Sequence, residues 1–376
     1  MRSTLSLYNA SMSIRDAVRQ AGQLAIAGFA GHSIPSDLRA LAKEFDLGGI
    51  ILFARNVESP EQVAEIAREA QALARELPLW VSVDQEGGRV ARLRSPFTLW
   101  PPMQTLGRSG DEQLAERFAR SLAAELCAVG VTLDFTPVLD ILTNPKNPVI
   151  GDRALAQTPE EVARLGTVII RTLQGEGIAA CGKHFPGHGD TSVDSHHEMP
   201  LVEHPPDRLD AVELVPFRAA IAAGVAGIMT AHLLVPAIDD EYPGTLSSAI
   251  VTGLLKEKLG FEGVVFTDDI GMKAISSVYG TPDATLRAIT AGCDVVLLCG
   301  DSQEPQFAAM ETLVHAIEDG TLPLKRVEDA LKRHRRMKER FLAPRRPRPL
   351  EGGALRTLLG RDEHQAVAAE MARFAS

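Results

Sequence analysis

A histidine-rich loop is the segment of this sequence with the clearest capacity for chemistry. Between residues 182 and 200 the chain holds four histidines together with Asp190, Asp194 and Glu198. Imidazoles and carboxylates bind metals, and they also act as general acids and bases. The three glycines and two prolines of the segment argue against a helix that presents two metal ligands on one face. We therefore expect no metal and favour acid–base chemistry.

Asp194 and His196 are the candidate acid–base pair within this loop. Two residues apart in a turn, the carboxylate can accept a hydrogen bond from the imidazole, orient the ring and keep its pKa near working pH. An Asx turn beside an exposed histidine would explain the same tripeptide. The pair therefore indicates acid–base catalysis only if the sequence supplies a second reactive group outside this tripeptide.

Asp268 is the candidate for that second group. It ends an apolar run at residues 263–267, so a strand would hold its carboxylate rigidly, as a nucleophile requires. The adjacent Asp269 would point to the other face of the strand, and we expect it to be a structural hydrogen-bond acceptor.

Other polar residues lie at the ends of apolar runs or in the loops that follow them. They are Asp84, Arg92, Asp140, Arg153, Lys183, His184 and His232. Charged groups that converge on one rim of an apolar structure cost free energy of folding unless they form ion pairs, so an unpaired set indicates a functional site. Arg92 and Arg153 could alternatively brace loops through ion pairs.

The elements that would position these residues form a regular alternation. Short apolar runs, typical of strands buried on both faces, lie at 24–30, 48–53, 79–83, 131–136, 178–182, 226–230, 263–267 and 293–299. Amphipathic segments between them predict helices at 37–45, 111–129, 206–223, 251–259, 282–291, 303–318 and 324–341, and two more that begin after Ser59 and Thr158.

Eight strands that alternate with helices predict an α/β fold, a (β/α)8 TIM barrel, whose active site lies at the carboxyl ends of the strands. A doubly wound open sheet would need a glycine-rich phosphate loop after the first strand, and residues 30–33 do not match one. We expect an N-terminal extension at 1–20, the catalytic barrel at 21–342, and a loose Pro/Arg-rich linker with a C-terminal helix at 343–376.

The composition of the chain argues against several classes of protein. The 376 residues carry a formal charge of 39 − 49 = −10, which argues against a nucleic-acid partner. No run is long enough to span a membrane. The apolar stretch at 21–30 lacks the frame of a signal peptide, and the four cysteines have no C-x-x-C spacing, so we expect a cytoplasmic protein with buried free thiols.

The basic stretch at 332–348 has nine basic residues and one acid. It could be an anionic contact surface, or the solvated end of the last helix followed by a linker.

Taken together, these motifs resemble one known family. The runs 183–190, 194–196 and 266–272, with 83–92 and 151–153, look like the single-domain β-N-acetylhexosaminidases of glycoside hydrolase family 3. The resemblance covers roughly residues 20 to 340. Thr267 and Ile270 depart from it, where Ser and Leu are common.

The resemblance implies a (β/α)8 barrel that removes a terminal β-linked N-acetylglucosamine, with a role in peptidoglycan recycling and no cofactor. By position, Asp268 would be the nucleophile, His196 the general acid/base and Asp194 its partner. Asp84, Arg92, Arg153, Lys183 and His184 would bind the sugar of a small carbohydrate substrate. The protein would be a monomer or a homodimer.

Several alternatives stay open. A phosphorylase would use the same nucleophile and histidine, with phosphate in place of water. A β-glucosidase-type glycosidase is a second enzymatic alternative. A metal-dependent hydrolase would lose activity with chelators, and a non-catalytic sugar-binding protein would bind without turnover.

Overall fold

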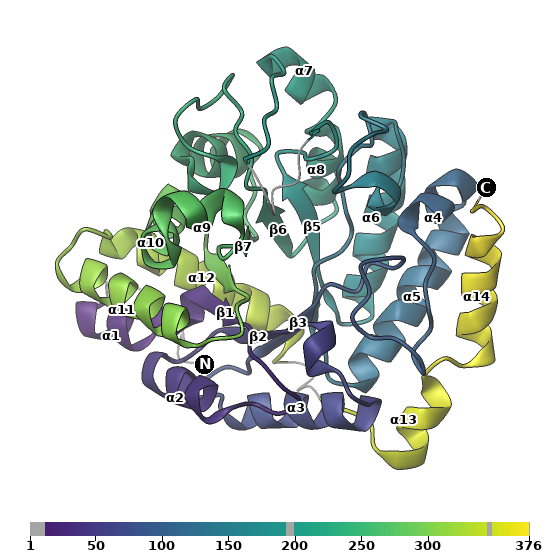
Figure 1. Ribbon diagram of the computed structural model, residues 1–376, viewed down its shortest axis with the longest axis horizontal. Coiled ribbons are helices and arrows are strands. Elements are labelled where there is room, and N and C mark those ends of the chain that lie inside the picture. The colour runs from purple at the N-terminus through teal and green to yellow at the C-terminus, as the bar shows by residue number, and fades with distance from the viewer. Residues whose placement is uncertain (1–11, 193–198, 344–347, 376) are drawn as a thin grey trace, which may run out of the picture.

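Eight parallel strands close into a barrel in neighbour order β1 to β8, with β8 paired to β1. The computed structural model describes residues 12–192, 199–343 and 348–375. Helices surround the barrel, and the chain's C-terminal helices lie at one side of it (Figure 1). The strands are β1 (Ala25–Ala27), β2 (Gly49–Leu52), β3 (Trp80–Val83), β4 (Leu133–Asp134), β5 (Ala179–Phe185), β6 (Gly227–Thr230), β7 (Val264–Asp269) and β8 (Val295–Leu298). The predicted (β/α)8 fold is confirmed.

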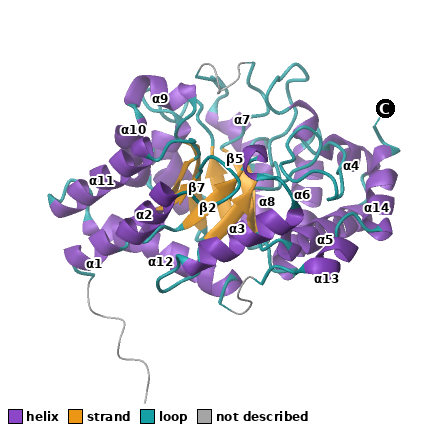
Figure 2. Ribbon diagram, turned by 60° about the horizontal axis from the view of Figure 1, so that its bottom comes forward, coloured by secondary structure: helices purple, strands orange, loops and turns teal. Residues whose placement is uncertain are grey.

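The helices lie outside the strands, as Figure 2 shows. They are α1 (Ile14–Arg19), α2 (Ser36–Phe45), α3 (Pro60–Ala72), α4 (Met103–Ser109), α5 (Glu112–Ala128), α6 (Pro159–Gly175), α7 (Pro206–Ala211), α8 (Val215–Ala222), α9 (Lys273–Tyr279), α10 (Thr281–Ala291), α11 (Glu304–Glu318), α12 (Leu324–Phe341), α13 (Gly352–Leu358) and α14 (Asp362–Ala372). Helix η5 (Ala249–Lys258) has π-helical turns, and short 3-10 turns occupy 21–24, 54–56, 151–153 and 244–246.

Side-chain caps fix where several helices begin. The Ser59 hydroxyl accepts from Gln62 N–H at the start of α3, and the Asp111 carboxylate accepts from two backbone amides at the start of α5. Thr158 was expected to cap α6 in the same way. Its hydroxyl donates to the Glu161 carboxylate instead, at 2.6 Å, and makes no cap bond.

Aromatic side chains fill the barrel interior. Phe135 and Phe266 meet edge to face with ring centroids 5.7 Å apart, and Trp80 is fully buried. The Trp80 indole N–H donates to His334 Nε2 on α12 at 2.7 Å, which ties the last helix of the barrel to strand β3. The interior is therefore a packed core that supports the rim above it.

Two helix predictions were wrong in detail. The segment 206–223 is not one helix but α7 and α8, because Pro216 has no N–H to donate and fits only in the first turn of a new helix. The C-terminal segment is likewise two helices. Gly360, with φ +58°, separates α13 from α14 in a left-handed conformation that favours glycine.

The C-terminal tail is also not loose. Leu355 on α13 and Met371 on α14 are fully buried, and both helices pack against α5. Figure 1 shows α14 along the outer side of α4 and α5, and α13 beyond the lower end of α5. Apolar burial of this kind makes the two helices part of the folded structure.

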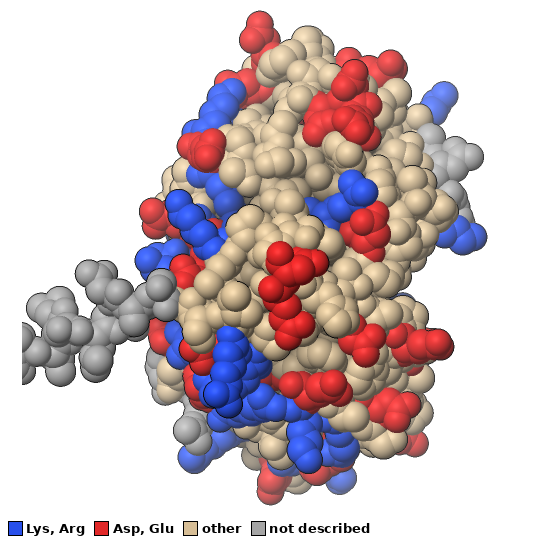
Figure 3. All heavy atoms as spheres, turned by 90° about the vertical axis from the view of Figure 1, so that its left-hand side faces the viewer, with Lys and Arg blue, Asp and Glu red and all other residues tan. Residues whose placement is uncertain are grey.

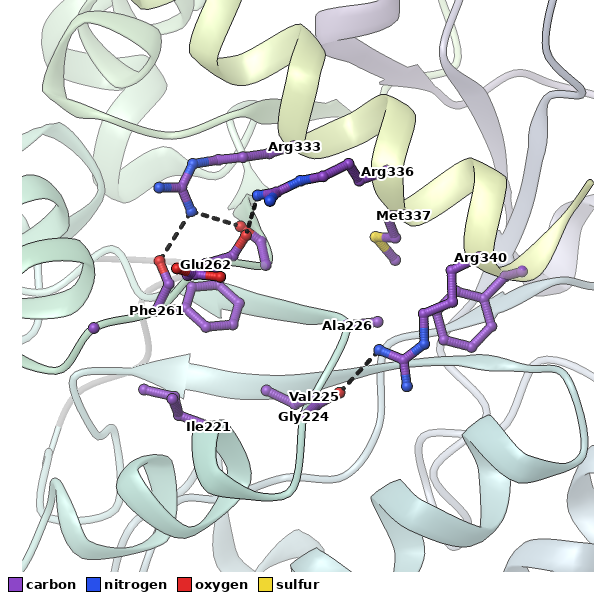
Figure 4. Close-up of a pocket in the computed structure, with 13 residues that line it drawn as sticks. Ile221, Gly224, Val225, Ala226, Phe261, Glu262, Arg333, Arg336, Met337 and Arg340 are labelled. Carbon is purple, nitrogen blue, oxygen red and sulfur yellow. Dashed lines mark hydrogen bonds between the residues drawn. The ribbon is translucent and has the colours of Figure 1, made fainter. Parts of the chain in front are cut away.

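Three basic residues of α12 donate to backbone carbonyls of neighbouring loops. Arg333 donates to the carbonyls of Phe261 and Gly263, and Arg340 donates to that of Gly224 at 3.2 Å. Figure 4 shows these arginines and Arg336 around a cavity of about 380 Å³ at the amino ends of β6 and β7. Three of the nine basic residues therefore satisfy backbone carbonyls at the bottom of the barrel.

The outer surface carries mixed charge. On the face seen in Figure 3, acidic and basic side chains lie among one another, as on an ordinary solvated surface. None of the helices within 12–192, 199–343 and 348–375 has the length and apolar composition needed to cross a bilayer.

Candidate active site

A cavity of about 170 Å³ opens at the carboxyl ends of the barrel strands. Seven of the residues singled out in the sequence line it: Asp84, Arg92, Arg153, Lys183, His184, Asp268 and Asp269. They come from four strands or the loops that follow them, namely β3, β4, β5 and β7. The fold thus brings together side chains up to 184 positions apart, 268 − 84, at one rim.

Glu86 forms the centre of a buried ion cluster on one wall. Its carboxylate accepts two hydrogen bonds from Arg153, each at 2.8 Å, and lies 2.6 Å from Lys183 Nζ. Lys183 also donates to Asp84 Oδ1 at 2.7 Å, and Arg92 reaches Asp84 Oδ2 at 3.4 Å. The two cations and two acids nearest the centre balance, so the cluster can be buried.

The cluster fixes the charge state of its members. Burial alone would raise the pKa of Glu86, but the charges of Arg153 and Lys183 outweigh burial and hold that pKa well below its usual range. Burial alone would lower the pKa of Lys183, but Asp84 and Glu86 raise it above its usual value. Glu86 and Lys183 are therefore charged at neutral pH, and the cluster presents a rigid set of donors and acceptors to the cavity.

His184 is oriented by a buried carboxylate. His184 Nδ1 lies 2.6 Å from Asp140 Oδ2, and Asp140 Oδ1 accepts the backbone N–H of His188 at 2.6 Å. The peptide bond between Lys183 and His184 is cis, and both side chains line the cavity. With Nδ1 bound to Asp140, the other ring nitrogen of His184 faces Arg153 at 3.5 Å, on the cavity side.

Asp268 is held on β7 as a buried carboxylate. Its Oδ1 accepts the backbone N–H of Asp269 at 2.8 Å. Burial would raise the pKa of Asp268, but the nearby His184 and His232 hold it below its ordinary value. An ionised carboxylate on a rigid strand is what a nucleophile needs.

Asp269 has a different role from Asp268. Asp269 Oδ1 accepts the backbone N–H groups of Gly271 and Cys299, at 2.9 and 3.1 Å. Burial raises its pKa. His232 Nε2 donates to the Asp269 carbonyl at 2.9 Å, and His232 Nδ1 lies 2.8 Å from the Thr245 hydroxyl. These contacts fix the β7 terminus and hence the direction of Asp268.

The predicted acid–base pair, Asp194 and His196, lies outside the described residues. The flanks of that loop are described. His188 lines the cavity, and Asp190 accepts from the Thr143 hydroxyl at 2.8 Å and pairs with His204 at 2.8 Å. The loop therefore starts at the cavity, anchored on the loops after β4 and β5.

Sequence reasoning missed two residues of this site, Glu86 and Asp140, as functional members. Glu86 follows Asp84 by two positions, and an extended chain places such residues on the same face. That spacing was a usable signal. Asp140 was also recognised as a polar residue at the end of an apolar run, but nothing in the sequence pairs it with His184, 44 positions away.

The described residues contain no group of three or more histidine, cysteine or acidic side chains arranged to hold a metal ion. The arrangement instead combines an ionised carboxylate that lines a small cavity with fixed cations, an oriented imidazole and acceptors. At the carboxyl ends of a (β/α)8 barrel, that combination has the nucleophile and the sugar-binding groups that a glycoside hydrolase requires.

Comparisons with known proteins identify the family. Residues 15–337 match the model of the glycosyl hydrolase family 3 N terminal domain, and the chain belongs to that family. A β-hexosaminidase of Nitrosomonas eutropha is 42% identical over 281 residues, which cover 71% of this chain and 80% of that protein.

Solved structures agree. A family 3 β-N-acetylglucosaminidase from Paenibacillus sp. superposes with a TM-score of 0.90 at 42% identity, over 95% of this chain and 68% of that one. NagZ from Neisseria gonorrhoeae has a TM-score of 0.77 at 33% identity, over 94% and 98% of the two chains.

Proposed function

We propose that this glycoside hydrolase is a retaining exo-β-N-acetylglucosaminidase that removes terminal, non-reducing N-acetylglucosamine. The observation that carries the proposal is Asp268, an ionised carboxylate at the floor of a cavity that also holds Lys183, His184 and Arg153. The similarity to β-hexosaminidases and to a β-N-acetylglucosaminidase structure supports the choice of sugar.

The first chemical step is attack of Asp268 on the anomeric carbon. The Asp268 carboxylate forms a bond to that carbon while the bond to the leaving oxygen breaks, and His196 protonates the leaving oxygen. Asp194 orients His196. In the second step His196 takes a proton from water, and the water oxygen displaces Asp268, so the sugar is released with its original configuration.

The ion cluster binds the sugar. Asp84 supplies an acceptor, while Lys183, Arg92, Arg153 and His184 supply donors suited to several ring hydroxyls. Because these groups already hold one another in place, they lose little entropy when the sugar enters. They can also hold the ring towards its distorted transition-state shape.

A histidine as the acid–base group suits an anionic leaving fragment. We propose that the natural substrates are muropeptides derived from peptidoglycan, whose leaving fragment carries carboxylates. An imidazole repels such a fragment less than a second carboxylate would. The corresponding setting is peptidoglycan recycling in the cytoplasm, by a monomer or a homodimer.

Turnover of an aryl β-N-acetylglucosaminide tests the assignment. Asp268→Asn should abolish hydrolysis while the protein remains folded, and wild-type turnover by this variant would refute the nucleophile. His196→Ala should lose most activity on a poor leaving group, and azide or an activated leaving group should restore part of it. Glu203→Gln, which changes an exposed carboxylate on the described C-terminal side of the same loop, is the matched control.

Two rival activities use the same nucleophile. A β-N-acetylglucosaminide phosphorylase would place phosphate where water attacks, and a β-glucosidase would act on a sugar without the acetamido group. Turnover independent of phosphate, together with a strong preference for the N-acetylated aryl glycoside over the glucoside, is the result that the proposal requires.

A further inference from the structure

A buried carboxylate joins the C-terminal tail to the barrel. Glu125 on α5 is 2% exposed. It accepts four hydrogen bonds: from Thr98 N–H at 2.9 Å, the Thr98 hydroxyl at 2.6 Å, Gly360 N–H at 3.0 Å and His364 Nδ1 at 2.8 Å. Two of these donors belong to the loop after β3, and two belong to the tail. Glu125 is therefore a clamp between the tail and that loop.

The loop side of the clamp carries residues of the active site. Thr98 belongs to the segment 84–102, which begins with Asp84 and includes Arg92. The Gln85 side-chain oxygen accepts Arg92 N–H at 2.8 Å, and Gly88 N–H donates to the Trp100 carbonyl at 2.8 Å. These bonds make the segment a single unit, so the position of its far end determines that of Arg92.

The tail side of the clamp fits closely. A Cβ on Gly360 would lie 2.3 Å from the carbonyl oxygen of Pro96, so the tail backbone rests directly against the same segment. His364 is 1% exposed, and its Nε2 accepts from Arg361 Nε at 2.9 Å. Since Nε2 is an acceptor, Nδ1 must carry the ring proton and donate it to Glu125.

We propose that helices α13 and α14 are a positioning part of the active site. Through Glu125 they hold the 84–102 segment so that Arg92 and Asp84 face the sugar. His364 and Glu125 touch no substrate, and they act only through Thr98. This inference rests on the proposed sugar-binding role of Arg92 and Asp84.

The test compares kcat and KM for an aryl β-N-acetylglucosaminide in His364→Ala and Thr98→Val, which weaken the clamp from its two sides. Because a displaced sugar-binding group weakens binding of the ground state and the transition state alike, each variant should raise KM roughly tenfold with little change in kcat. His364→Asn keeps a donor near the Nδ1 position and should restore most of the wild-type KM.

Glu370→Gln is the matched control. Glu370 on α14 pairs with Arg117 on α5 at 2.8 Å, so it joins the same two helices, but at the exposed surface and away from Thr98. This variant should keep the wild-type KM. If His364→Ala and Thr98→Val also kept the wild-type KM while their melting temperatures fell, the clamp would be purely structural and the inference wrong.

A double-mutant cycle separates this inference from the proposed function. Arg92→Ala should raise KM by itself, and adding His364→Ala should then raise it by a smaller factor than in the wild-type background, because the tail acts in part through Arg92. Fully additive effects would overturn the inference alone. An Arg92→Ala variant with unchanged KM would contradict the proposed sugar-binding role, and the inference with it.

Discussion

Replacing Glu86 with glutamine should destabilise the protein strongly at neutral pH. The Glu86 side chain is 1% exposed and receives three charged contacts, two from Arg153 and one from Lys183. Glutamine keeps the shape but turns an NH₂ group towards a cation. Removing one partner from a buried ion cluster costs about 3–5 kcal/mol. We expect the lower end, about 3 kcal/mol, because Asp84 still neutralises part of the charge on Lys183.

The pH dependence of this loss has a definite sign. The pKa of Glu86 is lower in the folded protein than its ordinary value of 4.5. A carboxylate with a depressed folded pKa stabilises the fold above its unfolded pKa, and that stabilisation is lost as pH falls towards the folded pKa. With an unfolded pKa near 4.5, the gap between the two proteins should shrink by about 0.8 kcal/mol between pH 7 and pH 4.

Urea denaturation at pH 7, 5 and 4 measures this directly, with Glu370→Gln as the control for removal of a surface ion pair. That control should lose less than about 1 kcal/mol, because Glu370 and Arg117 are both partly solvated. A Glu86→Gln variant within about 1 kcal/mol of wild type at pH 7 would refute the claim that Glu86 holds the cluster together.

Three further results are expected. Burial raises the pKa of Asp134 well above 3.8, so the stability of the wild-type protein should fall as pH rises. The melting temperature of Asp134→Asn should therefore increase relative to that of the wild type between pH 5 and pH 8. A constant difference in melting temperature would contradict this. Burial lowers the pKa of Lys338 to about 7, so wild-type stability should rise between pH 7 and pH 10; Lys338→Met should flatten that rise in urea titrations. Dialysis against a chelator should leave turnover of the aryl glycoside unchanged, because Asp268 and His196 supply the proposed chemistry; loss of activity that added metal restores would favour a metal-dependent hydrolase.

The barrel could be predicted from the sequence because each of its strands has a local sequence signal. Each strand is a short apolar run buried on both faces, and turns and helix starts separate the runs. The strand-end residues then followed from the rule that active sites of such barrels lie at the carboxyl ends of the strands. Asp268, Lys183 and His184 were found in this way.

Long-range contacts could not be predicted from the same signals. The hydrogen bond between Glu125 and His364 joins residues 239 positions apart, and no periodicity in the sequence predicts it. The same holds for the tail, which was expected to be a loose linker followed by one helix, because its packing partners on α5 lie far away in the sequence. The break at Pro216 was different. Proline has no backbone N–H, which is a local signal for a helix break, but the prediction placed one continuous helix across this position.

The most direct test of the proposed function is capture of the glycosyl–enzyme intermediate. A fluorinated, mechanism-based N-acetylglucosamine donor should label the wild-type enzyme once per chain. Peptide mapping should then place the label on Asp268, and Asp268→Asn should remain unlabelled. A label on any other carboxylate, or turnover that inverts the anomeric configuration and leaves no label, would contradict the account.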